Sequence, residues 1–554
     1  MRRDSGPAPR VEPCVPVQFQ ANCSEFADVL SSVGGQRNGH ACQPMDGEPA
    51  VLNLLQLLTS AMPDFAAPAE TGSINVRDVC CDSRAAGSGS LFVALLGKSA
   101  DGAAFASEAV GRGAVAVIAE SDIQLPKGVA FIKVPDARLA LAHIAAVFTG
   151  LSEAQKAGAY PAVGITGTNG KSTTAYLVRS ILAAAGRTTA LLGTIEYDLV
   201  GRKLASSLTT PDPVMLSRHL MEAREAGADA FVMEASSHSL DQRRTDGIRF
   251  AAAVFTNLTQ DHLDYHASFD EYLLAKRRLF DTLDPSATAV INADDPVADR
   301  MVEQCRSRVI RFGIDRPADL SARITSSDRG GTTFTMSFEG REIEISTAMV
   351  GRHNTANCLA AAGAAIAMGI DFDTIRRGIA GLANVPGRLQ RVETGDLGFD
   401  VFVDYAHTPD ALRNVLAAVR PLTRGRLCCV FGCGGNRDRT KRPLMARAVA
   451  ELSDYFVITS DNPRNEEPLR IIEDIERGLA ASDQDRKTTI PDRARAIAVA
   501  VNQLNPGDCL VIAGKGHEDY QIIGTTKHHF DDVEVAREAV AGREGKVNAT
   551  AYSA

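Results

Sequence analysis

The sequence has no long apolar segment of the kind that enters or crosses a membrane. No uninterrupted apolar stretch approaches the ~20 residues that a membrane-spanning helix needs. No apolar stretch follows Arg2 and Arg3, as a secretion signal would require. We therefore expect a cytoplasmic protein with no membrane partner and no export by that route.

Paired cysteines and an excess of basic charge are also missing. The eleven cysteines are an odd number without a C-x-x-C pair, which argues against a disulfide framework or a zinc site and fits a reducing cytoplasm. Lys and Arg total 59 against 68 Asp and Glu, a formal charge of −9. Nucleic acids and anionic membranes are bound by broad basic surfaces, so we expect neither as a partner. An anionic ligand must instead be bound by a local group of residues.

The apolar content of the sequence is sufficient for several folded domains. The 554 residues are 45% hydrophobic and 5% aromatic, and at ~100–200 residues per domain this length suggests about three domains. Residues 1–48 lack periodicity and are rich in Gly, Pro and Ser, so we predict a disordered extension there. An alternative is that translation starts at Met45. From Val51 the pattern VLNLLQLL predicts a helix.

Short apolar runs alternate with helical patterns along the rest of the chain. Three β-like runs within 76–155 alternate with Ala-rich stretches, which predicts a small α/β domain. Five further runs within 160–310 each end in a polar or Gly-rich loop. This pattern predicts a doubly wound, mostly parallel sheet that binds ligands at the carboxyl ends of its strands. A polar, strand-like stretch covers 320–348, and NVPGR at 384–388 marks a boundary. A third α/β set follows, with strands near 400–404, 427–431, 455–459 and 509–513.

The strongest local signal is GITGTNGKSTT at 164–174, where an apolar strand runs into a glycine-rich turn and a helix that begins near Lys171. In such a loop, backbone N–H groups and the helix N-terminus face an anion, and Lys171 can reach the β- and γ-phosphates. Ser172 or Thr173 can bind Mg²⁺. The general pattern G-x-x-x-x-G-K-[ST] is not met, because Ile165 stands where its first glycine would be. We predict an ATP-binding turn that consists of Gly167, Thr168, Asn169 and Gly170.

This short phosphate loop and the motifs that follow it resemble the Mur ligase family, cytoplasmic ATP-dependent enzymes that add amino acids to the peptidoglycan precursor. The resemblance runs from about residue 50 to 545 and is closest to the members that add meso-diaminopimelate. It implies an α/β protein of three domains and small-molecule substrates, and we expect a monomer. The implied domains are a small UDP-sugar-binding α/β domain at 49–155, a central doubly wound P-loop ATPase sheet at 156–385, and a Rossmann-like amino-acid-binding domain at 386–545.

The resemblance assigns metal ligands and a modified lysine to three motifs. FVMEASSHSLDQRR places Glu234 at the carboxyl end of a strand, where a carboxylate can hold Mg²⁺ together with Ser172. NLTQDHLDYH presents His262, which resembles the family's ligand for a second Mg²⁺. Lys276 in YLLAKRRLF corresponds to the family's carbamylated lysine, a modification that turns a cation into a carboxylate-like metal ligand. Without the resemblance, Glu234 and Lys276 would be interpreted as surface charges and His262 as a structural histidine. Lys171, His262 and Lys276 are the implied catalytic residues.

The far end of the nucleotide is assigned to three later motifs. GRHNTANCLAA resembles a family helix and gives Asn354 near the adenine. NVPGRLQ gives Arg388, and VDYAHTPD gives Asp404 near the ribose. Each of these signals is weak alone. Since Arg388 and Asp404 lie beyond the 384–388 boundary, ATP would bind between two domains and favour their closure.

Motifs of the third α/β set imply the amino-acid site. FGCGGNRDRTKRP fails the dinucleotide pattern G-x-G-x-x-G, so we reject NAD binding. In SDNPRNEEP, D-N-P-R is the signature of diaminopimelate-adding members, and the Arg464 guanidinium can bind the carboxylate that distinguishes diaminopimelate from lysine. Without the family context this segment would be interpreted as a turn with a surface arginine. In AGKGHEDYQ, the Glu518 carboxylate suits the distal ammonium group. The implied contacts are Arg437, Asp461, Asn462, Pro463, Arg464, Gly514 and Glu518.

The UDP-sugar end has the least specific motifs. CDSRAAGSGSLFVAL and GKSADG resemble the family's nucleotide-sugar loops, and LTTPDPV continues the path of the sugar-peptide. Cys81 stands where an apolar residue is expected. The implied contacts are Cys81, Ser83, Lys98, Ser99, Ala100, Thr209, Thr210, Ser236, Gln242 and Arg244.

The resemblance also implies a reaction. ATP would convert the D-glutamate carboxylate of UDP-N-acetylmuramoyl-L-alanyl-D-glutamate into an acyl phosphate, which the amine of meso-diaminopimelate attacks. Catalysis would rest on positioning and on charge neutralisation by Lys171 and two Mg²⁺ ions. The nearest alternatives are a lysine-adding ligase of the same step and a folylpolyglutamate-synthase-like ligase. From a different class, the chain would be a catalytically silent nucleotide sensor; the intact set of Lys171, Glu234, His262 and Lys276 argues against it.

Overall fold

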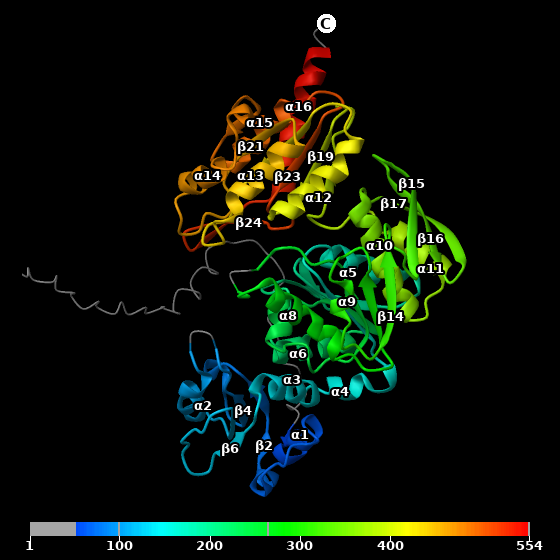
Figure 1. The fold of residues 1–554 in the computed structure, drawn as a ribbon. Coiled ribbons are helices and arrows are strands. Elements are labelled where there is room, and N and C mark those ends of the chain that lie inside the picture. Colours follow the sequence, from blue (N-terminus) through cyan, green and yellow to red (C-terminus); the bar gives the residue numbers. More distant parts are fainter. Residues whose placement is uncertain (1–50, 98–99, 263–264, 552–554) are drawn as a thin grey trace, which may run out of the picture. The chain divides into compact units, whose positions relative to one another are not determined.

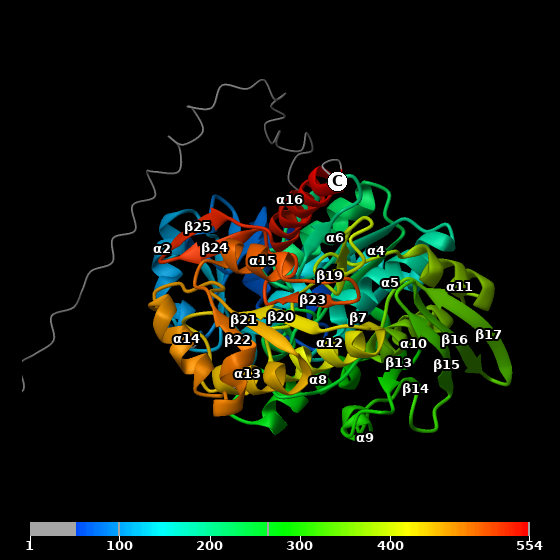
Figure 2. The ribbon, with the colours of Figure 1, turned by 90° about the horizontal axis from the view of Figure 1, so that it is seen from above.

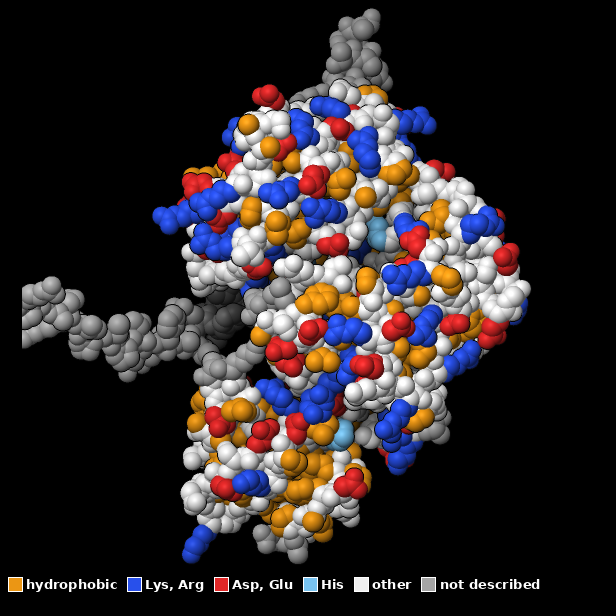
Figure 3. All heavy atoms as spheres, viewed as in Figure 1, with side chains coloured by type: hydrophobic (Ala, Val, Ile, Leu, Met, Phe, Trp, Pro, Cys, Tyr) orange, Lys and Arg blue, Asp and Glu red, His pale blue; other side chains and the backbone are white. Residues whose placement is uncertain are grey.

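The structure is a computed structural model that describes residues 51–97, 100–262 and 265–551. The predicted extension at 1–48 and the alternative start at Met45 lie outside the described residues. Among the described residues, no helix combines the length and the apolar character needed to cross a bilayer. On the face shown in Figure 3, basic and acidic side chains are interspersed.

The first α/β unit contains a parallel sheet with the strand order β3-β4-β5-β6. The helix predicted from Val51 begins instead at Leu54, because Leu52 and Asn53 pair with a neighbouring strand and the Asn53 side chain accepts a hydrogen bond from the N–H of Gln56. The elements are β1 Leu52–Asn53, α1 Leu54–Ala61, β2 Asn75–Val76, β3 Asp78–Cys80, β4 Ser90–Val93, α2 Ala106–Gly111, β5 Ala116–Ala119, β6 Ala130–Lys133, α3 Ala137–Phe148 and α4 Leu151–Ala154.

The central sheet has the strand order β10-β9-β8-β11-β7-β12-β13-β14-β15-β16-β17. Its middle strands are parallel, which confirms the predicted doubly wound sheet, while both edges are antiparallel. The strands are β7 Ala162–Thr166, β8 Thr189–Leu192, β9 Glu196–Asp198, β10 Lys203–Ala205, β11 Ala230–Glu234, β12 Phe250–Phe255, β13 Thr288–Asn292, β14 Arg308–Gly313, β15 Leu320–Asp328, β16 Gly331–Phe338 and β17 Arg341–Thr347.

Two apolar layers cover this sheet, because successive side chains of a strand point to opposite faces. In β11, Ala230 and Val232 pack into one layer, while Phe231 and Met233 pack into the other. Figure 1 shows α5, α10 and α11 grouped near β14–β17. The helices are α5 Lys171–Ala184, α6 Pro213–Glu225, α7 Ser237–Asp241, α8 Phe269–Asp281, α9 Ala298–Met301, α10 Arg352–Ala367 and α11 Phe372–Gly381.

The last α/β unit contains a sheet with the order β18-β19-β23-β20-β21-β22, parallel except at β18. Figure 2 shows α12–α14 and α15–α16 on opposite sides of it. A short hairpin, β24–β25, follows β23, and its second strand is exposed. The elements are β18 Gln390–Val392, β19 Asp400–Asp404, α12 Pro409–Val419, β20 Leu427–Phe431, α13 Lys441–Leu452, β21 Tyr455–Ile458, α14 Pro468–Glu476, β22 Lys487–Thr489, α15 Arg493–Asn502, β23 Cys509–Ala513, β24 Tyr520–Ile523, β25 Thr526–His529 and α16 Asp532–Ala551.

A fully buried ion pair joins α15 to α16 in this unit. The Arg493 guanidinium donates to both carboxylate oxygens of Asp532, at 2.7 and 2.6 Å, and both side chains are 0% exposed. Replacing Arg493 with methionine leaves the Asp532 carboxylate buried without its cation. We therefore expect the free energy of unfolding to fall by about 3–5 kcal/mol.

Thermal unfolding followed by circular dichroism measures this effect. Arg495→Met, which changes an exposed arginine on the same helix, is the matched control. We expect Arg493→Met to lower the midpoint of thermal unfolding and Arg495→Met to leave it unchanged. Equal midpoints for the two variants would contradict a stabilising role for the buried pair.

Candidate active site

The glycine-rich turn lies between β7 at the middle of the central sheet and α5. Gly167 and Gly170 have φ values of 148° and 85°, which favour glycine. A Cβ atom at Gly167 would lie 1.9 Å from the Thr256 hydroxyl oxygen, and one at Gly170 would lie 2.4 Å from Oδ1 of Asn357. Only glycine fits these two positions. The N–H groups of Thr168 and Asn169 donate to Asn257 at 2.8 and 3.0 Å, which holds the turn at the start of α5.

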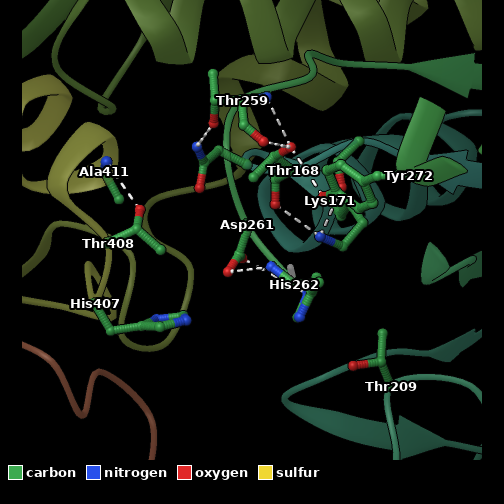
Figure 4. Close-up of polar contacts among 12 residues, drawn as sticks. Thr168, Lys171, Thr209, Thr259, Asp261, His262, Tyr272, His407, Thr408 and Ala411 are labelled. Carbon is green, nitrogen blue, oxygen red and sulfur yellow. Dashed lines mark hydrogen bonds and ion pairs between the residues drawn. The ribbon is translucent and has the colours of Figure 1, made fainter. Parts of the chain in front are cut away.

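Lys171 lies over this turn. Its Nζ donates hydrogen bonds to the carbonyl oxygens of Gly167 at 3.0 Å and Thr168 at 2.9 Å, and Figure 4 shows the ammonium group pointing toward Thr168. Burial lowers the pKa of Lys171 below its usual value, although the nearby Glu234 carboxylate opposes this shift. The lysine is thus held at the turn by weak neutral acceptors that a phosphate can replace.

Ser172, on the first turn of α5, meets Glu234 from the end of β11. The Ser172 hydroxyl donates to Oε1 of Glu234 at 2.9 Å, and the carboxylate is also bound by the N–H of Thr194 at 2.9 Å and by its hydroxyl at 3.0 Å. Glu234 is 1% exposed, not the surface charge that its sequence context alone suggests. Arg388 donates to the Ser172 hydroxyl at 3.2 Å from the C-terminal unit.

The oxygen ligands that the protein supplies in this arrangement suit Mg²⁺. A hydroxyl and a carboxylate are oxygen ligands that Mg²⁺ prefers, and this ion usually binds to one or two carboxylates together with phosphate and water. Within the described part of the chain, no three His, Cys, Asp or Glu side chains converge as a metal site. The residues therefore fit an ion that arrives with a phosphate rather than one held in a closed protein cage.

Lys276 from α8 reaches the same turn from the other side. Its Nζ donates to the Gly167 carbonyl at 2.8 Å and lies 4.6 Å from the centre of the Tyr272 ring. The residue is 1% exposed, so it is not a surface lysine. Burial, together with repulsion from Lys171, places the pKa of Lys276 well below its usual value, which favours the neutral amine.

His262 lies near Lys171 and Lys276, and it also lines a cavity. Its Nε2 is 3.6 Å from a carboxylate oxygen of Asp261, as Figure 4 shows, and its ring centre lies 5.0 Å from that of His238. Burial lowers the pKa of His262 to about 4, against the opposing effect of Asp261. A neutral imidazole is the form that ligates metals.

The residues predicted for the far end of the nucleotide differ in their surroundings. The Arg388 guanidinium lies over the Tyr405 ring at 4.5 Å, beside the phosphate loop. The Asp404 carboxylate accepts hydrogen bonds from the N–H groups of Leu389 and Ala406 at 2.7 and 2.8 Å. The Asn354 amide donates to the Val350 carbonyl within its own helix region at 2.9 Å. Their nucleotide contacts stay predictions.

A cavity of about 1060 Å³ lies beside these groups, between loops of the central sheet and loops of the C-terminal unit. Its walls include Thr194, His262 and His407, and they bring together residues predicted from two separate sets. From the sugar-peptide set, Thr209, Thr210, Ser236 and Arg244 line it. From the amino-acid set, Arg437, Asp461, Asn462, Arg464, Gly514 and Glu518 line it.

Gln242 and Pro463 do not line the cavity, although Gln242 hydrogen-bonds to Arg244, which does. The Gln242 side-chain oxygen accepts hydrogen bonds from Arg244 at 2.8 and 3.2 Å. The Pro463 carbonyl accepts the N–H of Glu466 at 3.1 Å.

Asn462 and Glu518 are linked at the end of the cavity where the predicted amino-acid contacts lie. The Asn462 amide donates to Glu518 at 2.8 Å, and its oxygen accepts a hydrogen bond from the fully buried Lys515 at 3.0 Å. Burial and the nearby Asp461 raise the pKa of Glu518, whereas Lys515 and Arg493 overcome the effect of burial and lower the pKa of Asp461. Two carboxylates thus face a pocket with a buried cation beneath them.

In the N-terminal unit, the predicted UDP-sugar contacts are partly described. The Ser83 hydroxyl is buried and donates to Glu108 at 2.8 Å. Cys81 is half-buried, and burial raises its pKa to about 11. Ala100 is exposed. Lys98 and Ser99 lie outside the described residues.

Comparison with known proteins decides the family. Three family models match in order: "Mur ligase family, catalytic domain" at 75–149, "Mur ligase middle domain" at 165–365 and "Mur ligase, glutamate ligase domain" at 387–516. The UDP-N-acetylmuramoyl-L-alanyl-D-glutamate--2,6-diaminopimelate ligase of Geobacter metallireducens is 43% identical over 490 residues, 84% of this chain and 95% of that protein. The enzyme with this name from Solibacter usitatus is 43% identical over 494 residues, 89% and 99% of the two chains.

The chain belongs to the Mur ligase family. It is therefore an ATP-dependent amide ligase. A solved structure of a UDP-N-acetylmuramoyl-L-alanyl-D-glutamate--2,6-diaminopimelate ligase matches with a TM-score of 0.65 and 32% identity, covering 89% of this chain and 100% of that one. A Mycobacterium tuberculosis folylpolyglutamate synthase matches with a TM-score of 0.56 at 20% identity over 72% of this chain and 95% of that one, a likeness that shows the shared fold alone.

Several residues at the cavity of this Mur ligase are not singled out by the sequence motifs. Thr194 follows the apolar run TALLG, and its backbone and hydroxyl both bind Glu234. His407 and His517 line the cavity from VDYAHTPD and AGKGHEDYQ. A polar residue in the loop just beyond the carboxyl end of a parallel strand is the signal that points to Thr194, since such loops gather at one edge of the sheet.

Proposed function

We propose that this Mur ligase joins meso-diaminopimelate to the D-glutamate of UDP-N-acetylmuramoyl-L-alanyl-D-glutamate with hydrolysis of ATP, in cytoplasmic peptidoglycan precursor synthesis. The names of the relatives support this substrate pair. The observation that carries the proposal is one cavity lined both by Thr209 and Arg244 of the central unit and by Arg464 and Glu518 of the C-terminal unit.

The reaction follows from the chemistry of the two groups that are joined. A carboxylate is a poor acceptor for an amine, so its oxygen first attacks the γ-phosphorus of ATP, which forms an acyl phosphate and releases ADP. The amine then attacks the acyl carbon, a tetrahedral intermediate forms, and phosphate leaves with the bonding electrons as the amide forms. No covalent bond to the protein is needed, so catalysis rests on positioning and charge neutralisation.

We propose roles for three segments in this reaction. Residues 49–155 bind the UDP-sugar, 156–385 bind ATP, and 386–545 bind the incoming amino acid. The turn at Gly167–Gly170 with Thr173 cradles the phosphates, and Arg388 approaches them from the C-terminal unit. We assign the adenosine end to Asn354 and Asp404.

Lys171, Ser172 and Glu234 form the phosphate-activating group. Lys171 exchanges its bonds to the Gly167 and Thr168 carbonyls for phosphate oxygens. Ser172, Glu234 and His262 would hold Mg²⁺, which supplies charge neutralisation at the transferred phosphate. The buried neutral amine of Lys276 is the form that adds to carbon dioxide, with loss of a proton, to give the proposed carbamate.

The amino-acid pocket explains a preference for diaminopimelate. Arg464 can bind the second carboxylate with two parallel charge-assisted hydrogen bonds, and Glu518 can pair with the distal ammonium group. Lysine would leave the half-buried guanidinium without an anionic partner, which costs binding free energy.

Product stoichiometry tests this proposal. With ATP, Mg²⁺, the UDP-dipeptide substrate and diaminopimelate, we expect one ADP and one phosphate released for each amide formed, and removal of Mg²⁺ by EDTA should stop both. ADP release that continues without amide formation, or amide formation without Mg²⁺, would contradict the mechanism.

A further inference from the structure

Two loops of the C-terminal unit lie side by side at the amino-acid end of the cavity. One follows β20 and contains Arg437, and the other follows β21 and contains Arg464. Each loop holds one non-glycine residue in the left-handed backbone region, Asn436 with φ 53° and Arg464 with φ 52°. This conformation is unfavourable for most side chains, so the surrounding contacts must maintain it.

Contacts between the two loops set the direction of the Arg464 side chain. Its Nη1 donates to the Gly435 carbonyl at 2.9 Å, and the N–H of Gly435 donates to the Asn462 carbonyl at 2.9 Å. A Cβ atom at Gly435 would lie 1.9 Å from the Pro463 carbonyl oxygen, so the backbones are as close as glycine permits. Any shift of one loop against the other therefore redirects the guanidinium.

Arg442, near the start of α13, lies beneath both loops and is 0% exposed. Its Nη1 and Nη2 donate to the two carboxylate oxygens of Glu466, each at 2.9 Å, and Nη2 also donates to the Gly434 carbonyl at 3.3 Å. Glu466 accepts a further hydrogen bond from the N–H of Asn436. The pair thus binds the first loop at two backbone positions and the second loop two residues after Arg464.

We propose that the Arg442–Glu466 pair is a positioning device for amino-acid selection. It holds the left-handed backbone at Asn436 and so places the neighbouring Gly435 carbonyl, which binds the Arg464 guanidinium and aims it at the place of the second carboxylate. Neither residue lines the cavity, so the pair acts through Arg464. A bidentate arginine–carboxylate pair adds geometric specificity as well as binding energy, which is the property that this role requires. This inference rests on the proposed function, to which it adds a pair of residues that supports the choice of amino acid.

The test compares diaminopimelate with lysine as substrate. Glu466→Gln keeps the shape of the side chain, which is 23% exposed, but weakens its bonds to Arg442 and Asn436. We expect kcat/KM for diaminopimelate to fall about 10-fold through KM, and the preference over lysine to fall equally, because a charge-assisted hydrogen bond contributes about that factor. KM for ATP should stay unchanged. Arg464→Met gives the upper limit of the loss.

Asp474→Asn is the matched control, because Asp474 binds only side chains here, Arg442 at 3.0 Å and Arg439 of the first loop at 2.8 Å, whereas Glu466 also binds the backbone of that loop. It should lower the thermal midpoint and leave the preference at the wild-type value. If Glu466→Gln does not fold, Glu466→Asp, which is too short to reach all its partners, provides the same comparison. A Glu466 variant with wild-type preference, or equal loss in Asp474→Asn, would overturn the inference. Absence of a preference in the wild type would instead contradict the role that the proposed function gives to Arg464.

Discussion

Lys171→Met should lower kcat for ADP formation by about 1000-fold, the range expected when a preorganised cation or donor is removed from the transferred phosphate. The Lys171 ammonium lies at the phosphate turn, bound to two backbone carbonyls rather than to a carboxylate. Methionine has a similar length and no charge, so it preserves the packing at the start of α5. The loss would then report charge neutralisation and not collapse of the turn.

Steady-state ADP release with all three substrates measures the effect. Lys127→Met, which removes an exposed lysine from the N-terminal unit, is the matched control and should keep wild-type kcat. A Lys171→Met enzyme within 10-fold of the wild type would show that this lysine does not stabilise the transferred phosphate.

Lys276→Ala should lower activity about 100-fold or more, and short carboxylic acids such as formate or acetate should restore part of it. The substitution removes the proposed carbamate and leaves a buried space next to the Gly167 carbonyl. A small carboxylate that enters this space places an anion where the modified lysine would bind the metal. A missing cation would not be replaced in this way.

Rescue by acids distinguishes a carbamylated Lys276 from a Lys276 that acts as a cation. Wild-type enzyme with the same acids provides the control and should gain nothing. Full activity of Lys276→Ala without any added acid would refute the assignment, and restoration by small amines but not by acids would show that the residue acts as a cation.

Much of the fold follows from local patterns in the sequence. The apolar runs AVGIT, TALLG, AFVME and AAVFT form β7, β8, β11 and β12, since buried strands read as short continuous apolar segments. The edge strands β10 and β25 are mostly exposed and have no such pattern, so the sequence does not predict them. Pairing with a neighbouring strand, rather than local composition, makes them strands.

In the site too, local features can be predicted from the sequence, whereas long-range contacts cannot. The phosphate turn is predictable because glycines and a lysine at a helix start are contiguous in the sequence. Burial of Glu234 and Lys276 is not, because their partners Ser172 and Gly167 lie 62 and 109 residues away. From the sequence alone, supporting residues such as Arg442 and Arg493 would be interpreted as surface charges, because the carboxylates that bind them are distant along the chain.

ADP release from the purified protein with Mg²⁺, ATP and UDP-N-acetylmuramoyl-L-alanyl-D-glutamate shows whether the protein is an ATP-dependent ligase with a pocket for diaminopimelate. Three parallel reactions contain meso-diaminopimelate, L-lysine or no amino acid. We expect sustained ADP release with diaminopimelate alone. Equal release with lysine would contradict the role given to Arg464, and no release in any reaction would contradict the proposed function.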